Sequence, residues 1–127
     1  MNLVVFGLTI SSSWGNGHAT LWRGLCKALA KLGHRVVFFE RDAPYYAAAR
    51  DCAAFDFCEL ELYSDWSEAR TAEILRDADA AIVTSYCPDA INAHRAILDA
   101  HRPLCVFYDL DTPVTLASLR HGERPAY

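Results

Sequence analysis

The chain has 127 residues, of which 53% are hydrophobic and 22% charged, with a formal net charge of −4. This composition supplies enough apolar material for one core and excludes a disordered chain. No block of Lys and Arg stands out, so nucleic-acid binding is not expected. No apolar run approaches the ~18 residues that span a bilayer. The N-terminal residues lack the features of a signal peptide and predict a strand.

The length fits one ordinary domain, and no internal linker divides residues 1–127. Five cysteines, an odd number with no C-x-x-C pair, indicate reduced thiols in a cytoplasmic protein. Their spacing is too wide for a zinc site. The sequence therefore predicts a single cytoplasmic domain without disulfides.

The first third of the chain alternates between strand and helix patterns. Asn2–Gly7 is a short β-branched and aromatic run that predicts a buried strand. Over Gly17–Leu32, Leu and Ala recur three and four positions apart, which predicts an amphipathic helix. Gly33 occupies the place of a left-handed C-cap, and Arg35–Phe39 is apolar enough for a second strand.

The middle of the chain carries weaker signals. Asp42 and Pro44 predict the start of a short helix that ends near Arg50. Cys58–Tyr63 alternates and predicts a third strand. Asp65 with Glu68 resembles a capping box, and it precedes a helical stripe formed by Trp66, Ala69, Ala72 and Leu75.

The last third returns to clear alternation. Ala80–Thr84 predicts a strand, Pro88–Ala100 a helix, and Pro103–Tyr108 a fifth strand. Thr112 and Pro113 predict the start of a final helix that ends near His121 and Gly122.

Strands that are apolar on both faces and alternate with helices indicate a parallel sheet covered on two sides. Right-handed crossovers then give a Rossmann-like, doubly wound α/β fold of about five strands in the order 3-2-1-4-5. The chain switches direction beside the first strand, and ligands bind outside the carboxyl ends of the strands at that point. Three segments should converge there: Leu8–Asn16, Thr84–Asp89 and Asp109–Thr112.

The loop SSSWGNGHATLW, residues 11–22, is the first candidate for a functional site. Gly15-Asn16-Gly17 matches the start of a dinucleotide fingerprint, and Glu40 lies where a ribose-binding acid would be. However, the strand ends at Gly7, too far from Gly15 for a tight pyrophosphate turn. The loop instead places His18 near a helix N-terminus, where the helix dipole favours a neutral imidazole. Such an imidazole can act as a general base; the alternative is a solvated residue in the first turn of the helix.

Four segments in order, FGLTISSSWGNGHATLWRGL, FFERDAPYY, AIVTSYCPD and VFYDLDTPVTL, resemble bacterial B-type glycosyltransferases related to spore-maturation proteins. The turn from Leu29 to Val36 is widespread among B-type glycosyltransferases in general, and the resemblance covers nearly the whole chain. It implies two Rossmann-like domains and transfer of a sugar from a nucleotide-linked donor to a small-molecule or glycan acceptor, with no metal or other cofactor. The chain would be a truncated acceptor-side domain. It would lack the C-terminal donor-binding domain and be inactive alone.

The same resemblance implies roles for individual residues. His18 would deprotonate the acceptor, and either Asp109 or Asp111 would hold the imidazole. These two carboxylates also form a D-x-D pattern, which can bind a metal, but the family implies none; one of them could instead cap the following helix. The residues expected to contact substrate are Ser12, Ser13, Trp14, Gly15, Asn16, Gly17, Arg41, Tyr45, Thr84 and Ser85.

Two other functions remain open from the sequence. The chain could be a nucleotide- or dinucleotide-binding Rossmann module. It could also be a non-catalytic interaction domain whose exposed sheet edge pairs with itself or with a partner.

Overall fold

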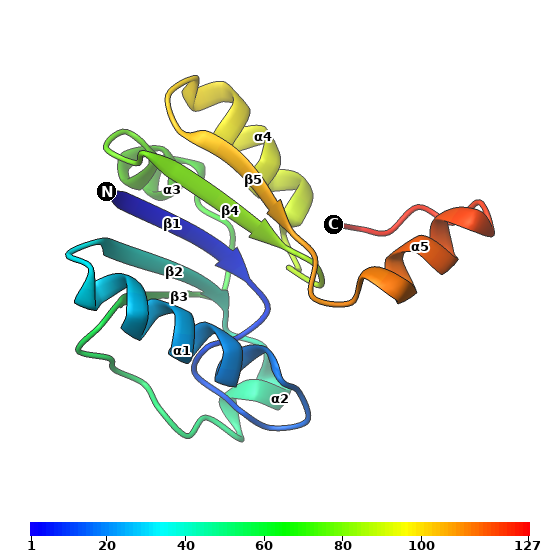
Figure 1. The fold of residues 1–127 in the computed structure, drawn as a ribbon, viewed down its shortest axis with the longest axis horizontal. Coiled ribbons are helices and arrows are strands. Elements are labelled where there is room, and N and C mark those ends of the chain that lie inside the picture. Colours follow the sequence, from blue (N-terminus) through cyan, green and yellow to red (C-terminus); the bar gives the residue numbers. More distant parts are fainter.

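Five parallel strands form one sheet in the order β3-β2-β1-β4-β5, which confirms the predicted Rossmann-like topology (Figure 1). The computed structural model describes all residues, 1–127. The strands are β1 (Asn2–Gly7), β2 (Arg35–Arg41), β3 (Glu59–Tyr63), β4 (Ala80–Thr84) and β5 (Leu104–Tyr108). The helices are α1 (His18–Lys31), α2 (Pro44–Ala47), α3 (Glu68–Leu75), α4 (Ala90–Ala100) and α5 (Thr112–Arg120).

The central strand β1 determines where the site lies. It pairs with β2 along its whole length, from Asn2 opposite Arg35 to Gly7 opposite Glu40. On its other side it pairs with β4, and Phe6 lies opposite Val83. Because the chain leaves β1 for β2 in one direction and later reaches β4 in the other, the switch point lies at the carboxyl end of β1.

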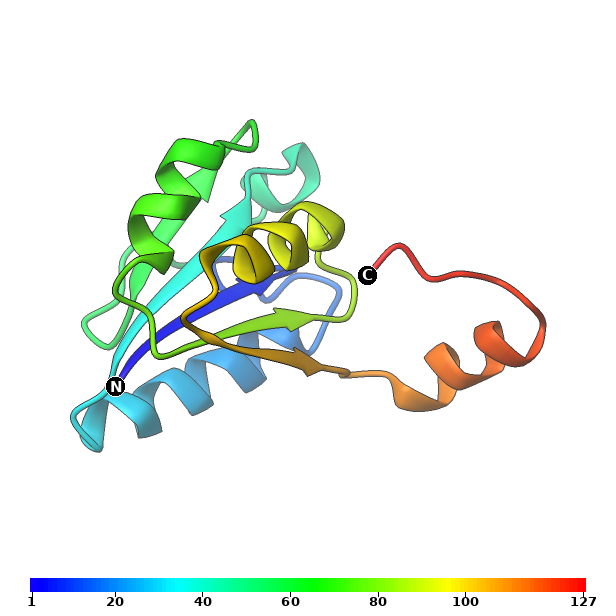
Figure 2. The same cartoon turned by 90° about the horizontal axis from the view of Figure 1, so that it is seen from above.

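Helices cover the two faces of the sheet unequally. Figure 2 shows α1 on one face and α3 with α4 on the other. On the α1 face, Trp22 and Cys26 are fully buried against Val5 and Phe38. The α3 and α4 face holds a second core, in which Leu75 and Ile97 pack on the strands. The buried stripe of α1 is therefore centred on Trp22 and Cys26, while Leu32 is exposed.

Strand β5 and helix α5 depart from the prediction of a fully covered sheet. Leu104, Phe107 and Tyr108 are exposed, and no residue of α5 is buried. Helix α5 extends away from the sheet beyond the carboxyl end of β5 (Figures 1 and 2). The apolar pattern of β5 was thus not a sign of burial, because in this chain nothing packs over its outer edge.

Several boundaries and caps also differ from the sequence prediction. Helix α2 is only four residues long. Its N-cap position is Ala43, and Asp42 does not cap the helix because its carboxylate pairs with Arg50. Ser67 caps α3 by accepting from the backbone N–H of Arg70. The predicted box of Asp65 and Glu68 is therefore wrong, since Ser67 is the residue next to the first turn. Thr71 and Leu75 form the buried side of α3, while Ala69 and Ala72 are exposed.

Candidate functional site

Contacts at the carboxyl edge of the sheet join the three segments that the topology places there. The backbone N–H of Ser85 donates to the carbonyl of Tyr108 at 3.1 Å. The Ser85 hydroxyl accepts from the N–H of Leu110 at 2.9 Å. The rings of His18 and Tyr86 meet edge to face, with their centroids 5.8 Å apart. These contacts hold the start of α1, the end of β4 and the start of α5 around one site.

The loop after β1 is held from inside by Glu40, the sixth residue of β2. Its side chain is fully buried, and its carboxylate accepts the backbone N–H groups of Ile10 and Ser11 at 2.7 and 2.9 Å. The hydroxyls of Ser11 and Thr9 donate to the other carboxylate oxygen at 2.6 and 3.1 Å. Both oxygens are thus occupied. Glu40 is not available for a ribose diol, which argues against the dinucleotide interpretation.

The serines of the loop have structural partners. The Ser12 hydroxyl is buried and donates to the carbonyl of Ala49 at 2.8 Å. Ser13 donates to Asp51, which also pairs with Arg23. These donors lower the pKa of Asp51 to about 2. Ser12 and Ser13 therefore tie the loop to the segment after α2.

The tip of the loop consists of Trp14, Gly15, Asn16 and Gly17. Trp14 is 60% exposed, and Gly15 has a φ of +69°, a conformation that favours glycine. The Asn16 side chain accepts from the N–H of His18 at 2.9 Å and donates to the Tyr46 hydroxyl at 3.3 Å. Asn16 thus satisfies one of the free N–H groups at the start of α1, although Gly17 holds the formal N-cap position.

His18 is the first residue of α1 and its side chain points into the protein. The residue is only 9% exposed, and its Nδ1 atom is buried without a hydrogen-bond partner. Burial lowers the pKa of His18, and the negative charge of Asp111 opposes this effect in part. The imidazole is therefore neutral at physiological pH. Two buried side-chain nitrogens lack a partner, His18 Nδ1 and Trp22 Nε1, which is uncommon in folded proteins. Trp22 belongs to the core beneath α1, whereas His18 lies at the start of that helix beside the loop.

Asp109 and Asp111 lie at the joint between β5 and α5. The Asp109 carboxylate accepts the backbone N–H of Asp111 at 3.0 Å and so fixes the turn. Asp111 occupies the N-cap position of α5, but its side chain does not cap the helix. No hydrogen bond joins either carboxylate to Nδ1 of His18. Asp111 acts on His18 through space, as its effect on the pKa of that residue indicates.

The remaining residues predicted to contact substrate occupy different surroundings. Thr84 and Ser85 are fully buried, and the Thr84 hydroxyl donates to the carbonyl of Ser85 at 3.1 Å. Arg41 binds both oxygens of Asp89 at 3.0 and 3.1 Å, so its guanidinium faces the start of α4. Tyr45 is exposed, and the centroid of its ring lies 4.6 Å from that of the Tyr46 ring. Thr84 and Ser85 are thus enclosed, whereas the side chains of Tyr45 and Arg41 are partly open to solvent.

Tyr86 belongs to the site although the sequence did not single it out. It has a φ of +62°, and its ring contacts both His18 and Tyr127. Only its place in the segment after β4 hinted at a role, because a left-handed conformation cannot be read from the letters Ser-Tyr-Cys-Pro.

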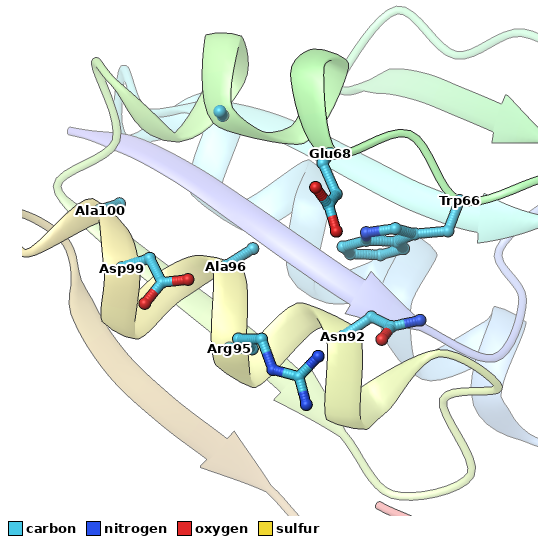
Figure 3. Close-up of a pocket in the computed structure, with 8 residues that line it drawn as sticks. Trp66, Glu68, Asn92, Arg95, Ala96, Asp99 and Ala100 are labelled. Carbon is cyan, nitrogen blue, oxygen red and sulfur yellow. The ribbon is translucent and has the colours of Figure 1, made fainter.

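A separate cavity of about 260 Å³ lies between α3 and α4 (Figure 3). Trp66 forms one wall, with Glu68 beside its ring and Asn92 and Arg95 across the groove. None of the residues predicted for the site lines this cavity. It is therefore distinct from the cluster around His18.

The structure contains no group of three or more His, Cys, Asp or Glu side chains placed to hold a metal ion. None of its helices is long and apolar enough to cross a membrane. Searches against protein families, curated proteins and solved structures give no match. The fold itself defines the chain as a Rossmann-like α/β domain with a polar, loop-built site at the carboxyl edge of its sheet.

Proposed function

We propose that this chain is the acceptor-binding part of a glycosyltransferase with two Rossmann-like domains, in which His18 is the general base. The observation that carries the proposal is the buried, unpartnered imidazole of His18 at the switch point of the sheet. Its lowered pKa keeps it in the neutral form that a base needs near pH 7. The resemblance of four segments to B-type transferases supplies the reaction class.

In the proposed reaction, His18 takes the proton of an acceptor hydroxyl as that oxygen attacks the anomeric carbon of the donor sugar. The bond from that carbon to the nucleoside diphosphate breaks, and the leaving group keeps the electron pair. The carboxylate of Asp111 stabilises the imidazolium that forms, since its charge already raises the pKa of His18. Asp109 holds Asp111 by accepting its N–H, so the two acids have separate tasks.

The acceptor would lie on the exposed tip of the loop. Trp14 and Tyr45 present free aromatic surface, and Gly15 and Gly17 have open space where a side chain would be. Ser12, Thr84 and Ser85 are buried and serve to hold the loops in place. In this proposal the acceptor therefore contacts Trp14, Tyr45 and the backbone near Asn16.

The donor would bind a second domain. The exposed apolar residues of β5 and α5, among them Leu104, Val114 and Leu119, support the view that further protein packs on this side. The 127-residue chain alone should then bind acceptor without catalysing transfer.

The test compares hydrolysis of UDP-, GDP- and TDP-linked sugars by this chain with hydrolysis by a polypeptide extended beyond Tyr127 by about one domain. We expect no turnover by the short form and turnover by the longer one, lost on His18→Ala or His18→Gln. His34→Gln serves as a matched control, because His34 lies at the far end of α1. An extended form that hydrolyses none of these donors would contradict the proposal.

A second candidate, a nucleotide-binding module, is separated by titrating the 127-residue chain with NAD, ATP and UDP. Tight binding of any of these by the isolated domain favours that function over the acceptor-side one. The occupied carboxylate of Glu40 leads us to expect no such binding of NAD.

A further inference from the structure

Tyr86 has a backbone conformation that bulky residues rarely adopt. Its φ is +62°, and the only other non-glycine residue with a positive φ is His101, at +55°. His101 has an ordinary explanation, since it is the left-handed C-cap of α4. Tyr86 ends no helix. It lies between β4 and α4, and strain of this kind concentrates where a structure places a functional group.

The neighbours of Tyr86 along the chain are fixed and force this conformation. Ser85 is hydrogen-bonded to the backbone of Tyr108 and Leu110, as described above. Cys87 is buried, and its N–H donates to the carbonyl of Thr84 at 3.2 Å. Between these two anchors the chain must turn, and the turn directs the Tyr86 ring toward α1. A glycine would make the same turn without strain, so the ring is what tyrosine adds.

The Tyr86 ring lies against the proposed base on one side and against Tyr127 on another. One side meets the imidazole of His18 edge to face, at 5.8 Å between centroids. The centroid of the Tyr127 ring lies 5.1 Å from that of the Tyr86 ring. Desolvation and the neighbouring Tyr127 and Asp111 raise the pKa of Tyr86, so its hydroxyl stays protonated and brings no charge near the imidazole.

We propose that Tyr86 is a positioning residue, whose ring covers the His18 imidazole and keeps it out of water. The effect of Tyr86 on His18 is a property of this chain and can be measured in it alone. Only the consequence of that effect for sugar transfer rests on the proposed function. The groups that face His18 are the carboxylate of Asp111, the ring of Tyr86 and the N-terminal end of α1. Among these, the Tyr86 ring is the part that a single substitution removes without changing any charge.

The experiment follows the His18 imidazole resonances by NMR during a pH titration of the 127-residue chain. In Tyr86→Gly the backbone is unstrained and the ring is gone, so we expect the pKa of His18 to rise toward its ordinary value. In Tyr86→Phe the ring remains, and the pKa of His18 should stay below that value.

His101→Gly is the matched control, because it relieves the same kind of strain at the end of α4, before β5 begins and so at the opposite edge of the sheet from the site. It should raise Tm by roughly a few degrees and leave His18 unchanged. If Tyr86→Gly does not fold, Tyr86→Asn replaces it, since Asn tolerates the left-handed region.

An unchanged pKa of His18 in the folded Tyr86→Gly or Tyr86→Asn variant overturns the proposal, since the ring would then not protect the imidazole. A fall in the pKa of His18 in the Tyr86→Gly variant would overturn the proposal equally. If instead the pKa rises as expected while His18→Ala leaves sugar transfer intact, the positioning by Tyr86 stands and the proposed base is wrong.

Discussion

Ser11 donates two hydrogen bonds to the buried carboxylate of Glu40, one from its backbone N–H at 2.9 Å and one from its hydroxyl at 2.6 Å. This pair fixes the path of the loop that leads from β1 to His18. A loop of this length would otherwise leave its backbone donors to water, whereas here a charge inside the protein satisfies them. Arg50 adds an outer support, since its Nε donates to the Ser11 hydroxyl at 3.1 Å and its guanidinium pairs with Asp42.

The first prediction concerns this support. Glu40→Ala leaves the N–H groups of Ile10 and Ser11 buried without partners, and we expect it to lower the free energy of unfolding by about 3–5 kcal/mol. Glu40→Gln keeps one carbonyl oxygen for the two N–H groups, and the hydroxyls of Thr9 and Ser11 can turn to accept. It should cost about 1–2 kcal/mol. Urea denaturation followed by circular dichroism measures both changes.

Glu59→Gln provides the control for Glu40, because Glu59 is an exposed glutamate that pairs with Arg35 at the surface. Such a pair contributes no more than about 1 kcal/mol. Equal effects of Glu40→Ala and Glu59→Gln would mean that the Glu40 network does not organise the loop.

The second prediction concerns pH. The folded state holds His18 with a lowered pKa, so between that pKa and about 6.5 the unfolded chain binds a proton that the folded chain does not. Stability is therefore fully present above about pH 6.5 and decreases as pH falls below it. Urea denaturation at intervals from about pH 7.5 to 5 should show this loss in the parent chain and a smaller loss in His18→Gln.

Asp51 titrates in a separate window, below the pH range of that measurement. Its pKa is about 2 in the folded state, so its contribution is present above about 3.9 and is lost only as pH falls toward 2. Asp51 is partly exposed, and its effect should be small.

If the parent chain and His18→Gln lose stability equally between pH 7 and 5, His18 is not protected from protonation in the folded state.

The sheet topology could be predicted from the sequence because apolar runs and helical periodicity repeat regularly. Ala80–Thr84 was predicted with both ends correct, and α1 within a residue at each end. The position of Gly33 as a left-handed residue after α1 is also confirmed, with a φ of +78°. These features depend on the local sequence, which is what such patterns record.

The parts of the site that escaped prediction depend on contacts across the fold. Glu40 was considered for a ligand, since nothing near it in the sequence shows that it faces the loop 30 residues earlier. Tyr86 looked like any residue of a connecting segment, because its φ is imposed by the anchoring of Ser85 to β5. Ser12 and Arg41 have partners, Ala49 and Asp89, that lie 37 and 48 positions away, so these contacts could not be predicted from the local sequence.

The third prediction tests the end of β1. A Cβ on Gly7 would lie 2.4 Å from Cζ of Phe38, whose ring is fully buried against Trp22. Gly7→Ala must therefore displace a core ring, and we expect a loss of about 1–3 kcal/mol in unfolding free energy. Gly24→Ala is the control, since a Cβ there meets open space on a helix and should stabilise by about 0.5–1 kcal/mol. A neutral Gly7→Ala would show that Phe38 can move freely.

The fourth prediction concerns the exposed apolar surface of β5 and α5. Leu104, Phe107 and Leu119 are each about half exposed or more, and the outer edge of β5 carries unpaired backbone groups. Such a surface promotes association, so the 127-residue chain should form dimers or larger species as its concentration rises. Leu104→Lys and Leu119→Lys should shift sedimentation velocity profiles toward the monomer. Leu32→Lys, at an exposed position beyond α1, should not. A chain that stays monomeric at high concentration would show that this apolar surface does not drive self-association.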